Sequence, residues 1–112
     1  MDPVLRAPCV RRRTATVPGM PERLQILRYA YVEDIAERRA PHREAHLALI
    51  GRYSDDGRIV IAGAVGDPPT GGEIVFREEA DAHAFRGEDP YVEAGLVTRW
   101  SVEPWNVVTP LP

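Results

Sequence analysis

The stretch RIVIAGAVGDPPTGGEIVF, residues 58–76, contains two runs of strand-forming residues on either side of a loop. Residues 58–62 and 73–76 are rich in isoleucine and valine, whose branched side chains favour strands. The glycines and prolines of residues 66–72 are typical of a loop. The stretch therefore predicts two strands that follow one another with no helix between them.

The residues that precede this pair of strands predict another strand and then a helix. Residues 24–32 are rich in β-formers and contain no glycine or proline. Asp34 and Glu37 have the spacing of a capping box, which would open a helical turn. Pro41 suits the first turn of the main helix, which we expect to end at about Tyr53.

The residues that follow the pair of strands predict a second helix and a last strand. Residues 78–86 are expected to form a short helix whose inward side chains are Ala80, Ala84 and Phe85. Residues 96–102 alternate apolar and polar side chains, as a half-buried strand does. The resulting order is βαββαβ, the α+β arrangement of a ferredoxin-like fold with a four-stranded antiparallel sheet.

One face of this sheet is predicted to be bare, because right-handed connections place both helices on the other face. Val60 and Ala62 alternate with Ile59 and Ile61, so the second strand is apolar on both sides. Soluble monomers avoid large exposed apolar patches, and two sheets can cover each other about a two-fold axis. We therefore expect a homodimer formed through the sheet face. The tryptophans expected in the core and in the dimer interface are Trp100 and Trp105.

Composition describes a single small domain and excludes several classes of protein. A chain of 112 residues can bury one hydrophobic core. The net charge of −3 argues against a nucleic-acid-binding surface, which normally needs a basic field. No apolar run approaches the roughly 18 residues that a membrane helix requires. The single cysteine, Cys9, cannot form an internal disulfide, which points to a reducing cytoplasm.

Residues 1–19 differ in composition from the rest of the chain. They are rich in arginine and proline and contain one acidic residue. We expect a disordered N-terminal extension, and the alternative is a basic arm that contacts a partner. Residues 20–112 would then form the folded domain.

Five tracts, taken in chain order, resemble the YCII-related (YciI-like) family. They are Tyr29-Ala30, Arg43-Glu44-Ala45-His46-Leu47, Ala62-Gly63, DPYVEAGL at residues 89–96 and PWNVV at residues 104–108. The resemblance implies a ferredoxin-like fold, assembly as a dimeric α/β barrel and a histidine–aspartate pair proposed as a catalytic centre. The chain departs from the family at Ala64, where members usually have proline.

The resemblance also assigns site residues by position. The family's histidine and aspartate map onto His46 and Asp89. The positions expected to contact a small-molecule substrate are Arg39, Arg43, Asp34 and Tyr91. The chemistry implied is cofactor-free proton transfer, of lyase, isomerase or dehydrochlorinase type, on an anionic or phenolic substrate.

The residues around His46 support an acid/base role without the family. His42, His46, Ile50 and Tyr53 share one face of the main helix. An imidazole can take or give a proton at cellular pH, and a carboxylate on its other nitrogen would fix its tautomer. The alternative is a core histidine whose hydrogen bonds are satisfied within the fold.

Each of the other candidates also has a structural explanation. Asp89 precedes a proline, as a helix N-cap does. Arg39 and Arg43 lie four residues apart and could bind an anion, or they could form surface ion pairs with Glu37 or Glu44.

The sequence predicts no metal site and leaves two function classes open. His42 and His46 have the spacing of a metal pair, but no third ligand is evident. The first class is an enzyme that uses the His46–Asp89 pair. The second is a non-catalytic protein that binds a small molecule or acts as an accessory dimer. A carboxylate within hydrogen-bond reach of His46 in an open cleft favours the enzyme, and a closed, dry environment favours the second class.

Overall fold

The computed structural model describes residues 22–111 and divides the chain into two compact units. Residues Leu24–Trp105 form the main unit, and the remaining described residues, 22–23 and 106–111, belong to the other. The prediction of an extension at residues 1–19 lies outside the described residues. The elements in chain order are β1 (Glu22–Tyr31), α1 (Ile35–Arg38), α2 (Ala40–Asp55), β2 (Ile59–Val65), β3 (Gly71–Phe76), α3 (Glu79–Glu88), α4 (Pro90–Glu93) and β4 (Val97–Val107).

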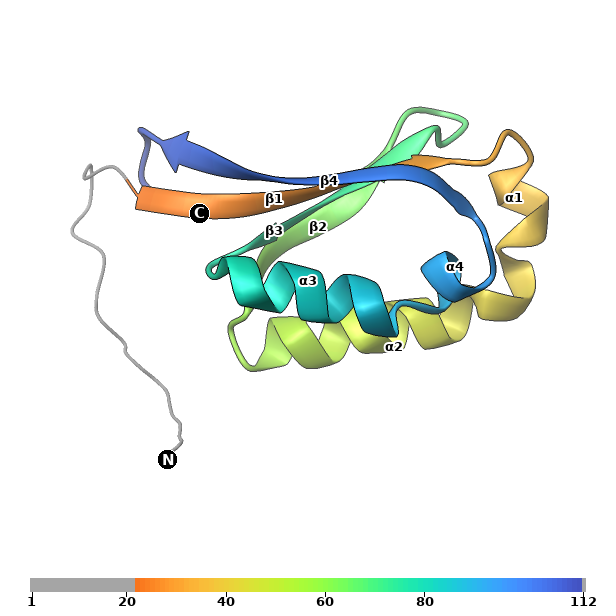
Figure 1. The fold of residues 1–112 in the computed structure, drawn as a ribbon, viewed down its shortest axis with the longest axis horizontal. Coiled ribbons are helices and arrows are strands. Elements are labelled where there is room, and N and C mark those ends of the chain that lie inside the picture. Colours follow the sequence, from red (N-terminus) through yellow and green to blue (C-terminus); the bar gives the residue numbers. More distant parts are fainter. Residues whose placement is uncertain (1–21, 112) are drawn as a thin grey trace. The chain divides into compact units, whose positions relative to one another are not determined.

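The four strands form one sheet in the order β2-β3-β1-β4. Strand β3 pairs antiparallel with β1, with Leu27 opposite Ile74, and antiparallel with β2 on its other side. Within the main unit, α2 and α3 cover one face of this sheet (Figure 1). These observations confirm the α+β, ferredoxin-like prediction.

Aromatic and aliphatic side chains from both helices and three strands form the core between these layers. They include Leu27 of β1, Leu49 and Tyr53 of α2, Phe76 of β3 and Phe85 of α3. The rings of Tyr53 and Phe85 meet edge to face with centroids 5.3 Å apart, a favourable aromatic geometry. The core therefore fixes α2 and α3 against the sheet.

The predicted inward face of α3 is partly wrong. Phe85 is buried as expected, but Ala80 and Ala84 are exposed, and Ala82 is the buried alanine. Residues three apart share a helix face, which places Ala82 beside Phe85. Ala84 and Ala80 lie one and five positions from Phe85, so they point elsewhere.

The predicted alternation along β2 is also wrong, because the strand contains a bulge. Ile59 lies opposite Phe76 and Ile61 lies opposite Val75, which leaves Val60 as an extra residue. Ile59 and Ala62 therefore both contact the core under the helices. Ile61 points to the opposite face and is 57% exposed.

The start of the first helix and the tryptophans differ from prediction as well. Asp34 makes no capping hydrogen bond through its side chain, so the capping box does not form. Pro41 does lie in the first turn of α2. Trp100 and Trp105 are each 44% exposed and are not core residues. None of the helices within residues 22–111 is long and apolar enough to cross a membrane.

Candidate functional site

His46 lies on the sheet-facing side of α2 and pairs with Asp89. The core position of Leu49 and Tyr53 on the same helix turns this side toward the sheet, as the spacing predicted. His46 is 6% exposed, and its Nδ1 lies 2.8 Å from Oδ1 of Asp89. The structure thus brings together two residues that are 43 positions apart in the chain.

Asp89 is the N-cap of α4 and the partner of His46 at the same time. Its Oδ1 accepts a hydrogen bond of 3.0 Å from the backbone N–H of Tyr91, which is the capping bond. Its Oδ2 accepts one of 2.8 Å from the hydroxyl of Tyr29. Since the carboxylate acts as an acceptor toward both groups, we assign the Nδ1 proton to His46 as the third donor. The neutral imidazole then has its lone pair on Nε2.

Tyr91 holds the plane of the imidazole. Its ring stacks on the His46 ring with centroids 3.7 Å apart and planes 5° from parallel. The Phe85 ring packs edge-on against the His46 ring, with the ring centroids 6.5 Å apart. The ring is therefore oriented by a hydrogen bond at Nδ1 and by aromatic contacts.

Tyr29 is a site residue that sequence reasoning missed as a functional group. It appeared only in a family tract and as a member of a predicted strand. Burial, followed by the adjacent Asp89 carboxylate, raises the pKa of its hydroxyl well above the usual range. It therefore stays protonated and remains a donor to Asp89 at all ordinary pH values.

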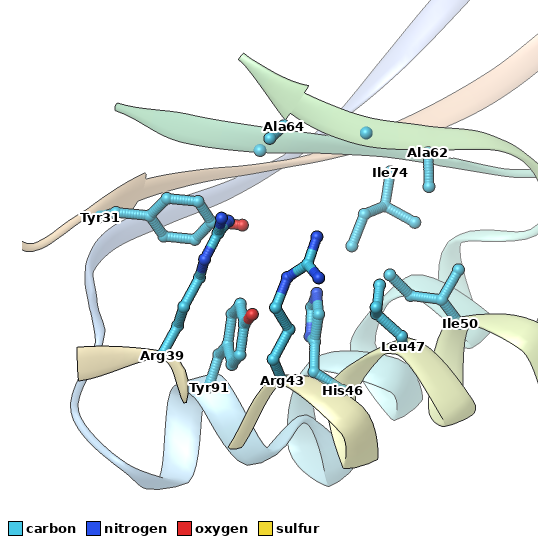
Figure 2. Close-up of a pocket in the computed structure, with 12 residues that line it drawn as sticks. Tyr31, Arg39, Arg43, His46, Leu47, Ile50, Ala62, Ala64, Ile74 and Tyr91 are labelled. Atoms are coloured by element: carbon cyan, nitrogen blue, oxygen red, sulfur yellow. The ribbon is translucent and has the colours of Figure 1, made fainter. Parts of the chain in front are cut away.

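A pocket of about 260 Å³ lies between α2 and the sheet, with His46 in its wall. Figure 2 shows the His46 ring pointing from α2 into this space, with Arg39 and Arg43 beside it. The lining residues are Tyr31, Arg39, Arg43, His46, Leu47, Ile50, Ala62, Gly63, Ala64, Gly72, Ile74 and Tyr91. Three of the four predicted substrate contacts, Arg39, Arg43 and Tyr91, thus line one pocket together with His46.

The two arginines of the pocket carry unpaired charges. Within the part of the chain that the structure describes, neither Arg39 nor Arg43 forms an ion pair with a carboxylate, so the pairs considered with Glu37 and Glu44 are absent there. Both arginines line the pocket together with Tyr91. Burial still raises the pKa of the Tyr91 hydroxyl, although both guanidinium groups oppose that shift.

Tyr31 is a second site residue that the sequence did not reveal, and it lines the pocket. Its hydroxyl lies over Gly72, where an added Cβ would come within 2.7 Å of the hydroxyl oxygen. Burial raises the pKa of Tyr31 to about 12. Gly71 and Gly72 were assigned to a loop, but they begin β3, and Gly71 also packs against the backbone carbonyl of Tyr29. Two consecutive glycines at a strand end were the available signal for this close packing.

Asp34 is placed apart from the other predicted site residues. Its carboxylate is exposed, lies 3.7 Å from the guanidinium of Arg38 and does not line the pocket. His42 does not line the pocket either. Among residues 22–111, no three or more histidine, cysteine or acidic side chains gather closely enough to hold a metal ion.

Comparison with a solved structure supports the fold. The chain superimposes on 5-chloro-2-hydroxyhydroquinone dehydrochlorinase from Burkholderia phenoliruptrix AC1100, in complex with 2,5-dihydroxybenzoquinone, with a TM-score of 0.62 and 24% identity. The match covers 73% of this chain and 92% of the other. At this identity the likeness shows a shared fold.

Comparison with known sequences gives the family. The YCII-related domain matches residues 23–106. The proteins named YciI from Escherichia coli O6:H1 strain CFT073 and from Shigella flexneri are each 35% identical over 86 residues, which is 67% of this chain and 88% of theirs. The resemblance seen in the five sequence tracts is therefore confirmed, and the chain belongs to the family of YCII-related domains.

Proposed function

We propose that the protein is a small cofactor-free enzyme in which His46 transfers a proton to or from a small anionic or phenolic substrate. The observation that carries this proposal is the orientation of the His46–Asp89 pair. Nδ1 is engaged by the carboxylate at 2.8 Å, while the same ring lines a pocket with two arginines that form no ion pair with any carboxylate of residues 22–111. A base held in one tautomer beside a cationic pocket suits proton abstraction from an anion.

The chain's own residues account for each part of such a reaction. His46 Nε2 removes a proton from a substrate carbon, and the electron pair of that C–H bond moves into a new double bond. In an elimination, the leaving group on the adjacent carbon departs with its own bonding pair. In an isomerisation, His46 returns the proton to a different carbon. Asp89 stabilises the imidazolium that forms between these steps.

The arginines and tyrosines of the pocket are assigned to binding. Arg39 and Arg43 would hold the anionic group, because a guanidinium forms two parallel hydrogen bonds to a carboxylate. Tyr31 would contribute a neutral hydroxyl, since its pKa is raised to about 12. Tyr91 would form one wall of the site while it orients His46. Tyr29 is a positioning residue that acts through Asp89.

The activity named for the solved neighbour is consistent with this chemistry. The solved neighbour is a dehydrochlorinase bound to a dihydroxybenzoquinone, and loss of hydrogen chloride is an elimination that begins or ends with proton transfer. His46 lies in the wall of a pocket, with the buried Asp89 carboxylate within reach of its other ring nitrogen, and this position favours the enzyme over a non-catalytic binding or accessory protein. The cytoplasmic location expected from the single cysteine stays a prediction.

The experiment is a reactivity panel with a matched histidine control. The full chain is incubated in D2O with chlorinated and hydroxylated aromatic acids and phenols, and deuterium incorporation and chloride release are followed. His46→Asn should lower the rate about 10²- to 10⁴-fold, while His42→Asn, on the same helix but outside the pocket, should keep it. Both variants should melt close to the wild type. If wild type and His46→Asn show equal rates, or if no panel member reacts, the binding or accessory class replaces the enzyme.

We also propose a homodimer through the sheet face that points away from the helices. Ile61 is 57% exposed and Val65 is 47% exposed, and Ile61 lies opposite Val75 in the sheet. The face is not uniformly apolar, because Arg28 pairs there with Glu73 and Glu103 at 3.3 and 2.6 Å. Trp100 is not part of this proposal, since its ring stacks under Arg86 of α3 at 3.9 Å.

A further inference from the structure

Along α2, the pocket residues follow one another in an order of decreasing polarity. Arg39 precedes the helix and Arg43 lies in its second turn, His46 and Leu47 come next, and Ile50 is one turn further. Spacings of three and four residues place them on one side of the helix. Figure 2 shows the same order in space, with the arginines toward one end of the pocket, His46 between, and Leu47 and Ile50 toward the other.

The end of the pocket at Arg39 and Arg43 is cationic. The twelve lining residues include these two arginines and no aspartate or glutamate. The hydroxyl-bearing side chains of Tyr31 and Tyr91 line the same pocket as the two arginines, and Figure 2 shows the four side chains at this end. Hydroxyls beside two guanidinium groups form a set of donors that matches a carboxylate.

The end of the pocket at Leu47 and Ile50 is apolar. Leu47 is 47% exposed although it lies next to a buried histidine, and Ile50 is half-buried beside it. The facing wall is provided by Ala62 of β2 and Ile74 of β3. A single exposed leucine is ordinary, but a leucine that continues an apolar pocket wall offers area that a ligand can cover.

The dimensions favour a short ligand. Arg43 and Ile50 are seven positions apart on the helix, which is about 10 Å along its axis. The volume of about 260 Å³ lies just below the roughly 300–1,000 Å³ of pockets that take drug-sized ligands. A ligand chain of about six to eight heavy atoms fits this span of about 10 Å.

We infer that the ligand of this pocket is a small amphipathic carboxylate, with its carboxylate between Arg39 and Arg43, its hydrocarbon part against Leu47 and Ile50, and its reacting carbon beside His46. The inference deepens the proposed function, since it names the class of substrate and the direction in which it lies. Helix α2 would set the orientation of the ligand in the pocket, because one face of that helix carries the two arginines, His46 and the apolar side chains Leu47 and Ile50.

The test compares ligands that differ in one property at a time. Binding of butanoate, hexanoate and 1-hexanol to the full chain is measured by NMR titration. Each methylene that enters the apolar end should strengthen binding about three- to fourfold. Hexanoate should bind about tenfold more tightly than 1-hexanol, because only the carboxylate can form charge-assisted hydrogen bonds with the arginines.

Paired variants locate each preference. Arg39→Gln with Arg43→Gln should bring hexanoate and 1-hexanol to similar affinity, whereas Arg38→Gln should keep the tenfold difference because Arg38 does not line the pocket. Leu47→Asn should flatten the dependence on chain length, and Ala48→Asn, on the same helix outside the pocket, should leave it unchanged. Melting curves identify any variant that has lost its fold.

The outcomes separate this inference from the proposed function. Equal binding of hexanoate and 1-hexanol to the wild type, or no saturable binding of either carboxylate, overturns the inference. An unchanged dependence on chain length in Leu47→Asn overturns it too. His46→Asn should keep both preferences, because the imidazole lies between the two ends. If the preferences hold and no panel compound reacts, the proposed function fails alone. If His46-dependent turnover is found on uncharged substrates, the inference fails alone.

Discussion

Replacement of Tyr29 by phenylalanine tests whether the Asp89 carboxylate depends on the Tyr29 hydroxyl. The Tyr29 ring is 5% exposed in the core, so phenylalanine keeps its packing and removes one O–H group. That group donates the 2.8 Å hydrogen bond to Oδ2 of Asp89, a residue that is 1% exposed. Water cannot readily replace the donor, so Tyr29→Phe should cost about 1.5–3 kcal/mol of unfolding free energy.

This cost converts into a measurable change in melting temperature. For a folded region of the length of residues 22–111, the entropy of unfolding is about 0.19 kcal/mol/K. A loss of about 2 kcal/mol therefore lowers Tm by about 10 °C. Circular dichroism or differential scanning calorimetry at neutral pH gives the value.

Tyr53→Phe is the matched control. The Tyr53 hydroxyl also donates to a carboxylate, Oε2 of Glu88 at 3.0 Å, and Tyr53 is 2% exposed. Glu88 is exposed, so water can solvate its carboxylate after the substitution, and the cost should stay below about 1 kcal/mol. If Tyr29→Phe melts no lower than Tyr53→Phe, the hydroxyl does not support the His46–Asp89 pair and the positioning role is wrong.

Three further predictions concern the whole chain. Light scattering at micromolar concentration should give about twice the chain mass of 12.5 kDa. Ile61→Glu should give a monomer, because the proposed interface contains Ile61. A monomeric wild type would overturn the proposed dimer. Burial raises the pKa of all four tyrosines, and the pKa of Tyr31 reaches about 12. Their protonated hydroxyls therefore contribute fully to stability below the unfolded-state pKa of about 10, and this contribution is lost as the pH rises toward 12. Tyrosinate absorbance should therefore rise together with the loss of far-ultraviolet circular dichroism, and tyrosinate in a fully folded protein near pH 10 would contradict this assignment. A chain that begins at Met20 should melt cooperatively within a few degrees of the full chain, whereas a large fall in Tm would show that residues 1–19 contribute to the fold.

The kinds of element and their order followed from the sequence alone. Runs of branched and aromatic residues marked the four strands, and Pro41 marked the first turn of α2. These signals are local, since they depend on the conformational preferences of neighbouring residues. Asp89 before Pro90 predicted an N-cap for the same reason, and the capping bond to the Tyr91 N–H is present.

The wrong predictions concerned which side chains of β2 and α3 face the core. These orientations depend on the pairing register of the strand and on the rotation of the helix, which composition does not determine. The bulge at Val60 changes which β2 side chains face the helices, because one extra residue shifts the two-residue period. The buried alanine of α3 is Ala82, because the position of Phe85 in the core sets the rotation of the helix.

Some residues of the candidate site could be predicted from the sequence, and others only from the tertiary structure. Family tracts in the sequence were enough to single out His46 and Asp89, and the spacing of Arg39 and Arg43 suggested a shared helix face. Only the tertiary structure showed that Tyr29, 60 positions before Asp89, donates to it, and that Tyr31 reaches over Gly72 into the pocket. The physical reason is that a hydrogen bond requires approach within about 3 Å, and for residues far apart in the chain that approach is decided by how the core packs the strands and helices together.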